Sequence, residues 1–224
     1  MTVHMFREID RLKKEILSLG ATVEESVMRA VRSVIERDTK LASDVLEMDK
    51  EIDHAEVDIE EECLKILALH QPVAVDLRFI VAVLKINSDL ERIGDLACNI
   101  AKQGRYLATR ERIEIPFDFG GMAGKAQKML KSALDALVNM DAVLAQGVCA
   151  ADDEVDEINR AMFAKVEDAI RAEPERLDDL IRLFAISRNV ERIADHATNI
   201  AEDVIYMTQG EIVRHRALDI EIEP

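Results

Sequence analysis

The sequence DLERIGDLACNIA at residues 89–101 recurs as NVERIADHATNIA at residues 189–201, 100 positions later. Eight of the thirteen aligned positions are identical. Upstream of this motif the match continues at an offset of 103, so that Asp38 corresponds to Asp141. Self-similarity at a fixed spacing indicates that one structural unit occurs twice. The chain is therefore predicted to contain two copies of the same fold.

Each copy is predicted to consist of three long helices. Val45, Ile52, Ile59 and Ile66 recur every seven residues, which places them on one face of a helix. Only 8 Gly and 4 Pro interrupt the 224 residues, and no segment of useful length alternates with the two-residue period of a strand. We expect an all-α fold of two repeated three-helix bundles, six long helices in all, with pseudo-two-fold character from the internal duplication.

Helix-breaking residues indicate where the elements begin and end. Pro72 must lie outside a helix, and three of the eight glycines fall in residues 113–124. The expected helices span residues 4–37, 39–69, 75–107, 122–146, 151–172 and 175–208. The expected organisation is a first bundle at 1–112, a linker at 113–124, a second bundle at 125–210 and a C-terminal tail at 211–224.

The composition excludes several functional classes. With 29 Lys and Arg against 45 Asp and Glu, the formal charge is −16, which disfavours binding to nucleic acid or to anionic lipid. Cys63, Cys98 and Cys149 are an odd number with no CxxC pair, as expected of reduced thiols. The N-terminus is charged from Arg7 onward and the longest apolar run, 79–84, is too short to cross a bilayer. We therefore expect a cytoplasmic protein.

A stripe of polar residues repeats on the third helix of each copy. Its residues are Glu91, Asp95 and Asn99 in the first copy and Glu191, Asp195 and Asn199 in the second. Residues four apart share a helix face, so each carboxylate pair can converge on one point. A solvated acidic face is the simplest alternative. Three features favour a bound metal cation. The stripe occurs twice, no Lys or Arg lies four residues further along the same helix face, and the residues upstream on that face are apolar. Carboxylates that continue a buried face repel one another unless a cation neutralises them.

The second helix of each copy carries another acidic pair at the edge of its apolar face. These residues are Asp49 and Asp53 in the first copy and Asp152 and Asp156 in the second. Each bundle is thus predicted to offer four carboxylates from two helices. Oxygen ligands of this kind favour Fe, Mn or Mg, with Zn as a further candidate, and four carboxylates are enough for a multinuclear cluster of divalent or trivalent ions. The identity of the metal stays open.

Other motifs carry less information. Glu51 and His54 form an ExxH pair as in di-iron proteins, but the second copy has Glu157 in place of the histidine. His196 is predicted to be interfacial and Arg92 to neutralise a neighbouring carboxylate. The chain has no phosphate-binding loop and no nucleophile elbow, and we expect no enzymatic activity.

The duplicated motif E-R-I-[GA]-D-x-A-x-N-I-A, together with D-L-R-F at 76–79 and G-E-I-V-R-H at 210–215, resembles the PhoU family over nearly the whole chain. That resemblance implies a regulator of phosphate transport built from two three-helix bundles. The family's paired [ED]xxxD signature matches the same eight carboxylates. The resemblance also implies negative regulation of the phosphate-starvation response through the ATPase subunit of the phosphate ABC transporter and a sensor histidine kinase.

The same resemblance guides the partner predictions. Arg78 is predicted to make a partner contact specific to the first bundle, because the second copy only approximates D-L-R-F at 179–182. Recruitment to the membrane is expected to come from protein partners, and a homodimer is a further expectation. Two alternatives stay open: a ferritin-like di-iron carboxylate protein, with redox-active metal inside the bundle, and a purely structural helical scaffold without stoichiometric metal.

Overall fold

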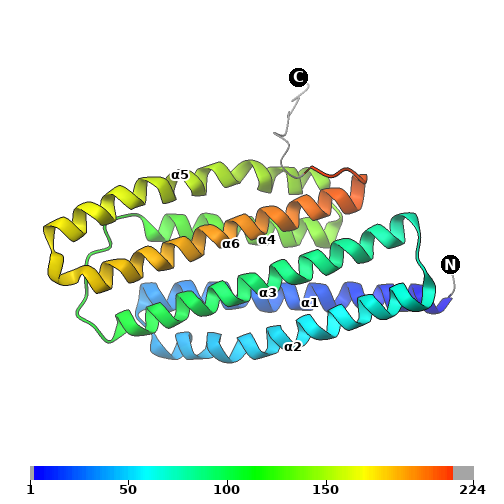
Figure 1. The fold of residues 1–224 in the computed structure, drawn as a ribbon, viewed down its shortest axis with the longest axis horizontal. Helices are drawn as coiled ribbons and strands as arrows, with labels where there is room; N and C mark the ends of the chain where they lie inside the picture. Colours follow the sequence, from blue (N-terminus) through cyan, green and yellow to red (C-terminus); the bar gives the residue numbers. More distant parts are fainter. Residues whose placement is uncertain (1–2, 214–224) are drawn as a thin grey trace, which may run out of the picture.

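The computed structural model describes residues 3–213, and this part of the chain contains six α-helices and no β-strand (Figure 1). The helices are α1 Val3–Glu36, α2 Thr39–His70, α3 Ala74–Ala108, α4 Phe119–Asn139, α5 Ala142–Ala172 and α6 Leu177–Gln209. A short 3₁₀ turn, Pro174–Arg176, precedes α6. Helices α1–α3 pack on one another, and so do α4–α6, which confirms the predicted pair of three-helix bundles.

The two bundles lie side by side with their long axes nearly parallel (Figure 1). Helices α3 and α6 run through the middle of the molecule and make the main contact between the bundles. A smaller contact joins α1 and α4. The third helix of each copy is therefore the one that faces the other bundle as well as its own.

The apolar seams predicted from the sequence form the core. On α2, Val45, Ile52, Ile59 and Ile66 are each at most 1% exposed. On α3 the corresponding seam, including Leu90, is equally buried. Complete burial of a side chain of this size contributes about 1.5–3 kcal/mol relative to exposure. The heptad-like spacing of these residues therefore accounts for how each bundle holds together.

Helix α4 begins earlier than expected. It starts at Phe119, inside the segment 113–124 that was expected to be a linker. The Asp118 carboxylate accepts a hydrogen bond from the Gly121 backbone N–H at 2.9 Å, and this cap starts the helix despite the glycines that follow. The connection between α3 and α4 is accordingly residues 109–118.

The turn between α4 and α5 was predicted at residues 146–151, and that prediction was wrong. The chain turns at Met140, whose φ is 54°, and the Asp141 side chain caps α5 by accepting from the N–H groups of Val143 and Leu144. The first copy turns in the same way, with Arg37 at φ 57° and Asp38 as the cap of α2. The break between α4 and α5 therefore lies at Met140 and Asp141, and Gly147 lies within α5.

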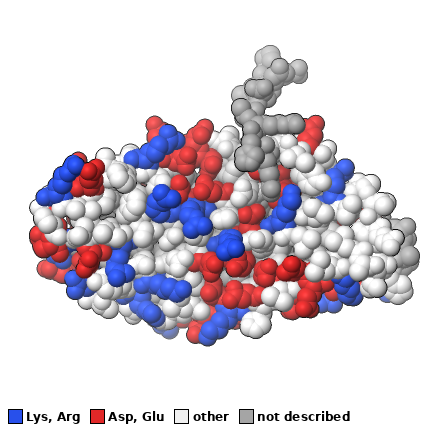
Figure 2. Space-filling view, viewed as in Figure 1, with Lys and Arg blue, Asp and Glu red and all other residues white. Residues whose placement is uncertain are grey.

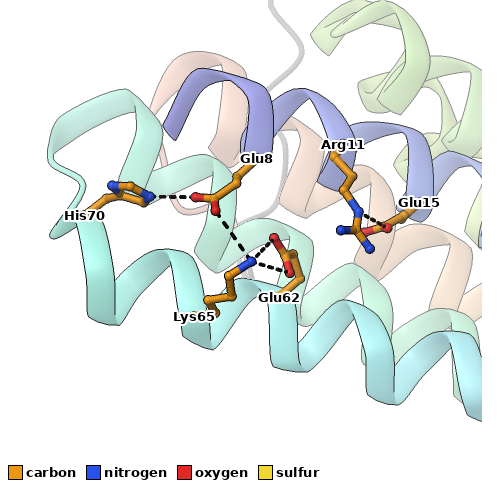
Figure 3. A network of polar contacts seen from close by, with 6 residues as sticks. All are labelled: Glu8, Arg11, Glu15, Glu62, Lys65 and His70. Atoms are coloured by element: carbon orange, nitrogen blue, oxygen red, sulfur yellow. Dashed lines mark hydrogen bonds and ion pairs between the residues drawn. The ribbon is translucent and has the colours of Figure 1, made fainter. Parts of the chain in front are cut away.

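Polar contacts join the start of α1 to the end of α2 (Figure 3). The Glu8 carboxylate of α1 lies 2.6 Å from the His70 ring at the end of α2 and 3.5 Å from the Lys65 ammonium. Lys65 also pairs with Glu62 at 3.0 Å. At the other end of the bundle, the Arg37 guanidinium donates to the carbonyl of Ala108 and so closes the end of α3.

Two sequence predictions concern the chain ends and the membrane. The predicted C-terminal tail, 211–224, lies outside the described residues from 214 onward. Within residues 3–213 no helix is long and apolar enough to span a bilayer.

Candidate metal centre

In the first bundle the four predicted carboxylates lie together on the seam between α2 and α3. Burial raises the pKa of Asp49, and the nearby negative charges of Asp53 and Asp95 raise it further. Burial also raises the pKa of Glu91, with Asp95 the next largest cause. Each of these shifts involves carboxylates of both helices, so the two acidic pairs lie near enough to influence one another; that they converge on one metal ion stays a prediction.

The second bundle brings its four carboxylates together in the same way on α5 and α6. Burial raises the pKa of Asp152 to about 6, and the charges of Asp195 and Asp156 contribute to the shift. The pKa of Asp195 is also raised, first by burial and then by Glu191 and Asp156. Like charges held this close in a partly desolvated seam disfavour ionisation of one another.

Close packing beneath the first set of carboxylates comes from a glycine. Gly94 of α3 lies against the fully buried Ile52 of α2, and a Cβ at Gly94 would stand 3.2 Å from that side chain. The missing side chain therefore lets the two helices approach between Asp53 and Asp95. The second copy has Ala194 at the matching position, so its helices meet with an extra methyl group between them.

The outer carboxylates of each set point toward solvent. The Asp95 side chain is 52% exposed and lies 3.9 Å from the Arg92 guanidinium, which also lies 3.6 Å from Glu91. Asp156 is 42% exposed and lies 3.6 Å from Arg160. In these orientations no three His, Cys, Asp or Glu side chains within residues 3–213 are grouped closely enough to hold one ion. Metal binding would require the exposed carboxylates to turn inward.

The second bundle contains buried oxygen atoms that suit a cation. Asp152 Oδ1, Asn159 Oδ1, Glu191 Oε2 and Thr198 Oγ1 are all buried and have no hydrogen-bond partner. The Thr198 hydroxyl lies close enough to Asp152 to lower the pKa of that carboxyl, against the larger effect of burial. A buried polar atom without a partner costs about 1–3 kcal/mol, and coordination of a cation would remove that cost. The residues of this seam therefore fit a hard cation.

The structure adds residues to the site that the sequence analysis missed. In the first bundle Glu56 follows Asp53 on the same face of α2, and burial together with Glu60 and Asp53 raises its pKa. In the second bundle Asn159 and Thr198 occupy the seam. Helical spacing could have found them, because each lies three residues beyond a predicted carboxylate: Asp53, Asp156 or Asp195.

The two asparagines predicted to extend the stripe have different surroundings. Asn99 is exposed on α3. The Asn199 amide donates to Asp89 of the other bundle at 3.2 Å. Asp89 also lies 2.7 Å from the Nδ1 atom of His196, which confirms the prediction that this histidine is interfacial.

The second set of carboxylates opens into a groove of about 740 Å³ between the bundles. The groove is lined by Lys85, Ser88 and Asp89 from α3, and by Asp152, Asp195, Thr198, Asn199 and Glu202 from α5 and α6. Lys85 reaches across it and pairs with Asp203 at 3.1 Å. The candidate site in the second bundle is therefore bordered by both bundles.

A ferritin-like centre does not match this geometry. Such a centre needs carboxylates and ExxH histidines that project into the interior of a four-helix bundle. Here the acids lie along two-helix seams, with Asp53 and Asp95 exposed, and His54 is also exposed with its ring against the Lys50 carbonyl. The single ExxH motif is therefore not part of the carboxylate site.

Arg78 lies between the bundles at the start of α3. Its guanidinium packs against Gly210 at the end of α6, where a Cβ would stand 3.0 Å from Nη1 and where φ is +79°. The Arg78 Nε atom is buried without a hydrogen-bond partner. Part of this side chain is thus used within the chain, and its contact with another protein stays a prediction.

Fold and site together define a duplicated three-helix-bundle protein with a carboxylate-lined seam in each bundle. The family model described as the PhoU domain matches residues 16–104 and again residues 119–204, one match for each bundle. The chain belongs to the PhoU family.

Named relatives match over nearly the full length. The phosphate-specific transport system accessory protein PhoU homolog of Pseudomonas aeruginosa is 37% identical over 94% of this chain and 88% of its own length. The protein of the same name from Aquifex aeolicus is 34% identical over 95% of this chain and 96% of its own.

Solved structures show the same fold. The crystal structure of PhoU from Pseudomonas aeruginosa superimposes with a TM-score of 0.88 at 36% identity, over 92% of this chain and 99% of that one. The phosphate transport system regulatory protein PhoU from Streptococcus pneumoniae gives a TM-score of 0.84 at 28% identity, over 93% of this chain and 99% of that one.

Proposed function

We propose that this protein is a cytoplasmic regulatory adaptor of phosphate uptake that restrains the phosphate-starvation response and binds metal ions in both bundles. The observation that carries the proposal is the match to accessory proteins of phosphate-specific transport over 94% and 95% of this chain. Both bundles and their connection are therefore shared with those proteins. The adaptor acts by contact with the ATPase subunit of the phosphate ABC transporter and with a sensor histidine kinase, and it performs no catalysis.

An exposed apolar surface supports the contact with a protein partner. We call the exposed side chains of Leu69, Val73 and Val75, which are 65%, 73% and 61% exposed, the apolar end of the first bundle. The end of the molecule where α2 turns into α3 carries few charged residues in Figure 2. Clustered apolar side chains at a surface are typical of interaction sites. Arg78 follows this surface near the start of α3, which begins at Ala74.

The metal ions proposed for the two seams would neutralise the clustered carboxylates. Asp49, Glu91 and their neighbours would hold the ions in the first bundle, and Asp152, Glu191 and their neighbours in the second. Such an ion would link the two helices by binding carboxylates from both.

Co-sedimentation with membranes tests the adaptor proposal. The wild-type protein should pellet with membranes that contain the transporter and the kinase, and stay in the supernatant with protein-free anionic vesicles. Val73→Asp combined with Val75→Asp should reduce the pelleted fraction, because both changes place charge on the apolar end. Val143→Asp is the matched control, since Val143 is 77% exposed but lies on the second bundle.

Equal pelleting with protein-free vesicles would contradict the proposal. Normal recruitment of Arg78→Ala would show that Arg78 is not part of the contact.

Elemental analysis of protein purified without chelator tests the metal proposal. We expect stoichiometric metal in the wild type. The double variant Asp95→Asn with Asp195→Asn should lose most of it while its circular dichroism stays helical. Unchanged metal content in this variant would show that the ligand assignment is wrong.

A further inference from the structure

A patch of exposed apolar side chains lies on α5 and α6, toward the turn that joins them. Phe163 of α5 is 59% exposed, and Leu177 and Ile181 of α6 are 42% and 50% exposed. The Phe163 ring meets the partly buried ring of Phe184 edge to face, with 5.8 Å between the ring centres. Positions 177, 181 and 184 share one face of α6 because of their helical spacing. We call these four residues the second-bundle patch.

The first bundle shows that the fold does not require these rings. At the offsets of the repeat, Phe163 corresponds to Glu60 and Phe184 to Leu84. A carboxylate thus occupies the place of the exposed phenylalanine in a bundle of the same architecture. Large apolar side chains that are exposed together are typical of surfaces that bind another molecule. The aromatic pair therefore indicates an interaction surface in the second bundle.

Two arginines lie one helical turn beyond the aromatic pair. Arg160 comes three residues before the phenylalanine of α5, and Arg188 comes four residues after that of α6. Because the two helices run in opposite directions, both steps lead the same way along the bundle (Figure 1). In the first copy the residues at these places are the uncharged Val57 and Ser88. Both arginines are therefore specific to the second bundle.

These arginines leave positive charge beside the patch. Arg160 is 73% exposed and lies 3.6 Å from Asp156, so part of its charge is compensated. Arg188 is exposed, and no carboxylate of residues 3–213 lies within ion-pair distance of it. On the other side of the patch, Glu167 lies 2.5 Å from Arg171 and is compensated there. The uncompensated charge next to the patch is therefore that of an arginine, in a chain whose formal charge is −16.

We propose that the second-bundle patch, with Arg160 and Arg188 beside it, is a docking surface for a segment of a partner protein that carries carboxylates next to a bulky apolar side chain. The exposed ring of Phe163 supplies apolar contact area, and the guanidinium groups pair with carboxylates through charge-assisted hydrogen bonds. A protein segment can place one or two negative charges on the arginines alone. A membrane surface or a nucleic acid would bring many more charges against the acidic residues of the same bundle.

This surface is separate from the apolar end of the first bundle. The turn between α2 and α3 and the turn between α5 and α6 lie at opposite ends of the molecule (Figure 1). A partner on one of the two surfaces therefore leaves the other accessible. The inference rests on the adaptor role proposed above. It assigns the second-bundle patch to one of the two proposed partners and the apolar end to the other.

Binding to two kinds of membrane tests the inference. One contains the transporter without the kinase, the other contains the kinase without the transporter, and each is titrated with the full-length protein by co-sedimentation. Phe163→Ser should weaken binding to one of the two membranes about tenfold or more and leave the other unchanged. Arg160→Gln with Arg188→Gln should weaken the same binding and reduce its dependence on salt. Val73→Asp with Val75→Asp should instead weaken binding to the other membrane.

The controls match these variants in exposure and charge. Leu64→Ser removes an apolar side chain that is 53% exposed on α2, and it should bind both membranes as the wild type does. Arg11→Gln with Arg32→Gln makes the same change of charge as the arginine variant, at exposed positions of α1, and should also bind normally. All these variants should keep the circular dichroism and nearly the melting temperature of the wild type, because the replaced side chains are exposed.

The other outcomes are distinguishable. If Phe163→Ser and the arginine variant bind both membranes as the wild type does, or lose both equally, the inference is wrong while the adaptor role stands. Wild-type binding to protein-free anionic vesicles that disappears in the arginine variant would assign the surface to lipid and would also overturn the inference. If the wild type binds neither membrane, the proposed adaptor role itself fails.

Discussion

At the scale of single residues, Gly104 marks a close approach of α3 to α1. A Cβ at this position would stand 2.8 Å from Val34 Cγ2 and 3.6 Å from the Val34 Cα atom. Valine has little rotamer freedom in a helix, so the backbone would have to move. We expect Gly104→Ala to lower the free energy of unfolding by about 1–2 kcal/mol, because overpacking outweighs the gain in helix propensity. Urea unfolding followed by circular dichroism measures the change.

The control for Gly104 is a glycine in open space. No atom lies within 4 Å of a Cβ built at Gly124 in α4. Gly124→Ala should therefore raise the free energy of unfolding by up to about 1 kcal/mol through helix propensity alone. If both substitutions changed stability in the same direction, close packing at Gly104 would not be the reason for its glycine.

Asp152 makes the stability of the metal-free protein depend on pH. Its pKa is raised to about 6 in the folded chain, from an ordinary value of 3.8, so the folded state binds this proton more tightly than the unfolded state. The ionised carboxylate therefore lowers the free energy of unfolding. This cost is fully present above pH 6 and disappears as the pH falls toward 4. Asp152→Asn in the presence of chelator should stabilise the protein by roughly 1–2 kcal/mol at pH 7.5, after allowance for solvent screening, and by much less at pH 4.

The measurement is urea unfolding of both proteins at the two pH values. With a divalent cation in place of chelator, the sign at pH 7.5 should reverse, because the variant loses a charged ligand. A stabilisation by Asp152→Asn that did not change with pH would show that the carboxylate is not the titrating group.

At the scale of helices, the sequence was sufficient for the elements whose signal is local. Seven-residue spacing placed Ile52 and Ile59 in the core, and they are at most 1% exposed. The turn at Met140 was missed, although the alignment of Asp141 with Asp38, a residue able to cap a helix, pointed to it. Gly147 lies inside α5. An isolated glycine in a helix costs only about 1 kcal/mol, which the packing of α5 on its neighbours exceeds.

The sequence also predicted part of the candidate site, namely the residues whose positions follow from helical spacing. Carboxylates four residues apart on one helix follow from helical geometry, and in each bundle the acidic pairs of the two helices lie near enough to shift one another's pKa values. Whether they bind a metal together stays a prediction. Asn159 and Thr198 were missed because the search was for charged ligands and these are neutral. Whether their oxygen atoms have partners depends on how two helices face each other, which the sequence of either helix does not contain.

The ends of α1 and α2 are joined by a contact whose strength depends on pH (Figure 3). The hydrogen bond with His70 is the largest cause that lowers the pKa of Glu8, and Lys65 adds to it. A lowered pKa means that the carboxylate contributes stability above its ordinary value of 4.5, and that this contribution is lost as the pH falls through the lower folded value. Glu8→Gln should cost up to about 1 kcal/mol at pH 7, and progressively less as the pH falls below the ordinary pKa and through the lowered folded pKa.

The comparison for Glu8 is Asp10→Asn on the same helix. Asp10 pairs only locally, with Lys14 four residues along at 2.8 Å, and both side chains are well exposed. Its replacement should have a smaller effect at pH 7 than Glu8→Gln, because no second helix is involved. An equal effect of the two variants in thermal unfolding would contradict the assigned role of His70.

At the scale of the whole molecule, the contact between α3 and α6 makes two bundles into one body. Near one end of this contact, the Arg182 guanidinium of α6 lies 3.7 Å from the centre of the Tyr106 ring of α3 and also donates to Gln103 at 2.5 Å. Arg110 lies 5.8 Å from the same ring and 3.5 Å from Asp179, which is only 2% exposed. The aromatic ring thus lies against cations from both sides of the contact between bundles.

Replacement of Tyr106 measures how much this cluster couples the bundles. Tyr106→Leu keeps apolar bulk but removes the ring face, and should lower the free energy of unfolding by about 1–2 kcal/mol through loss of both cation–π contacts. Tyr106→Phe keeps the ring face and should cost much less. The two bundles should still unfold in a single transition in the wild type, whereas Tyr106→Leu should broaden it as the bundles become less coupled. Equal destabilisation by the phenylalanine and leucine variants would show that the hydroxyl or the packing volume, and not the ring face against Arg182, stabilises the contact.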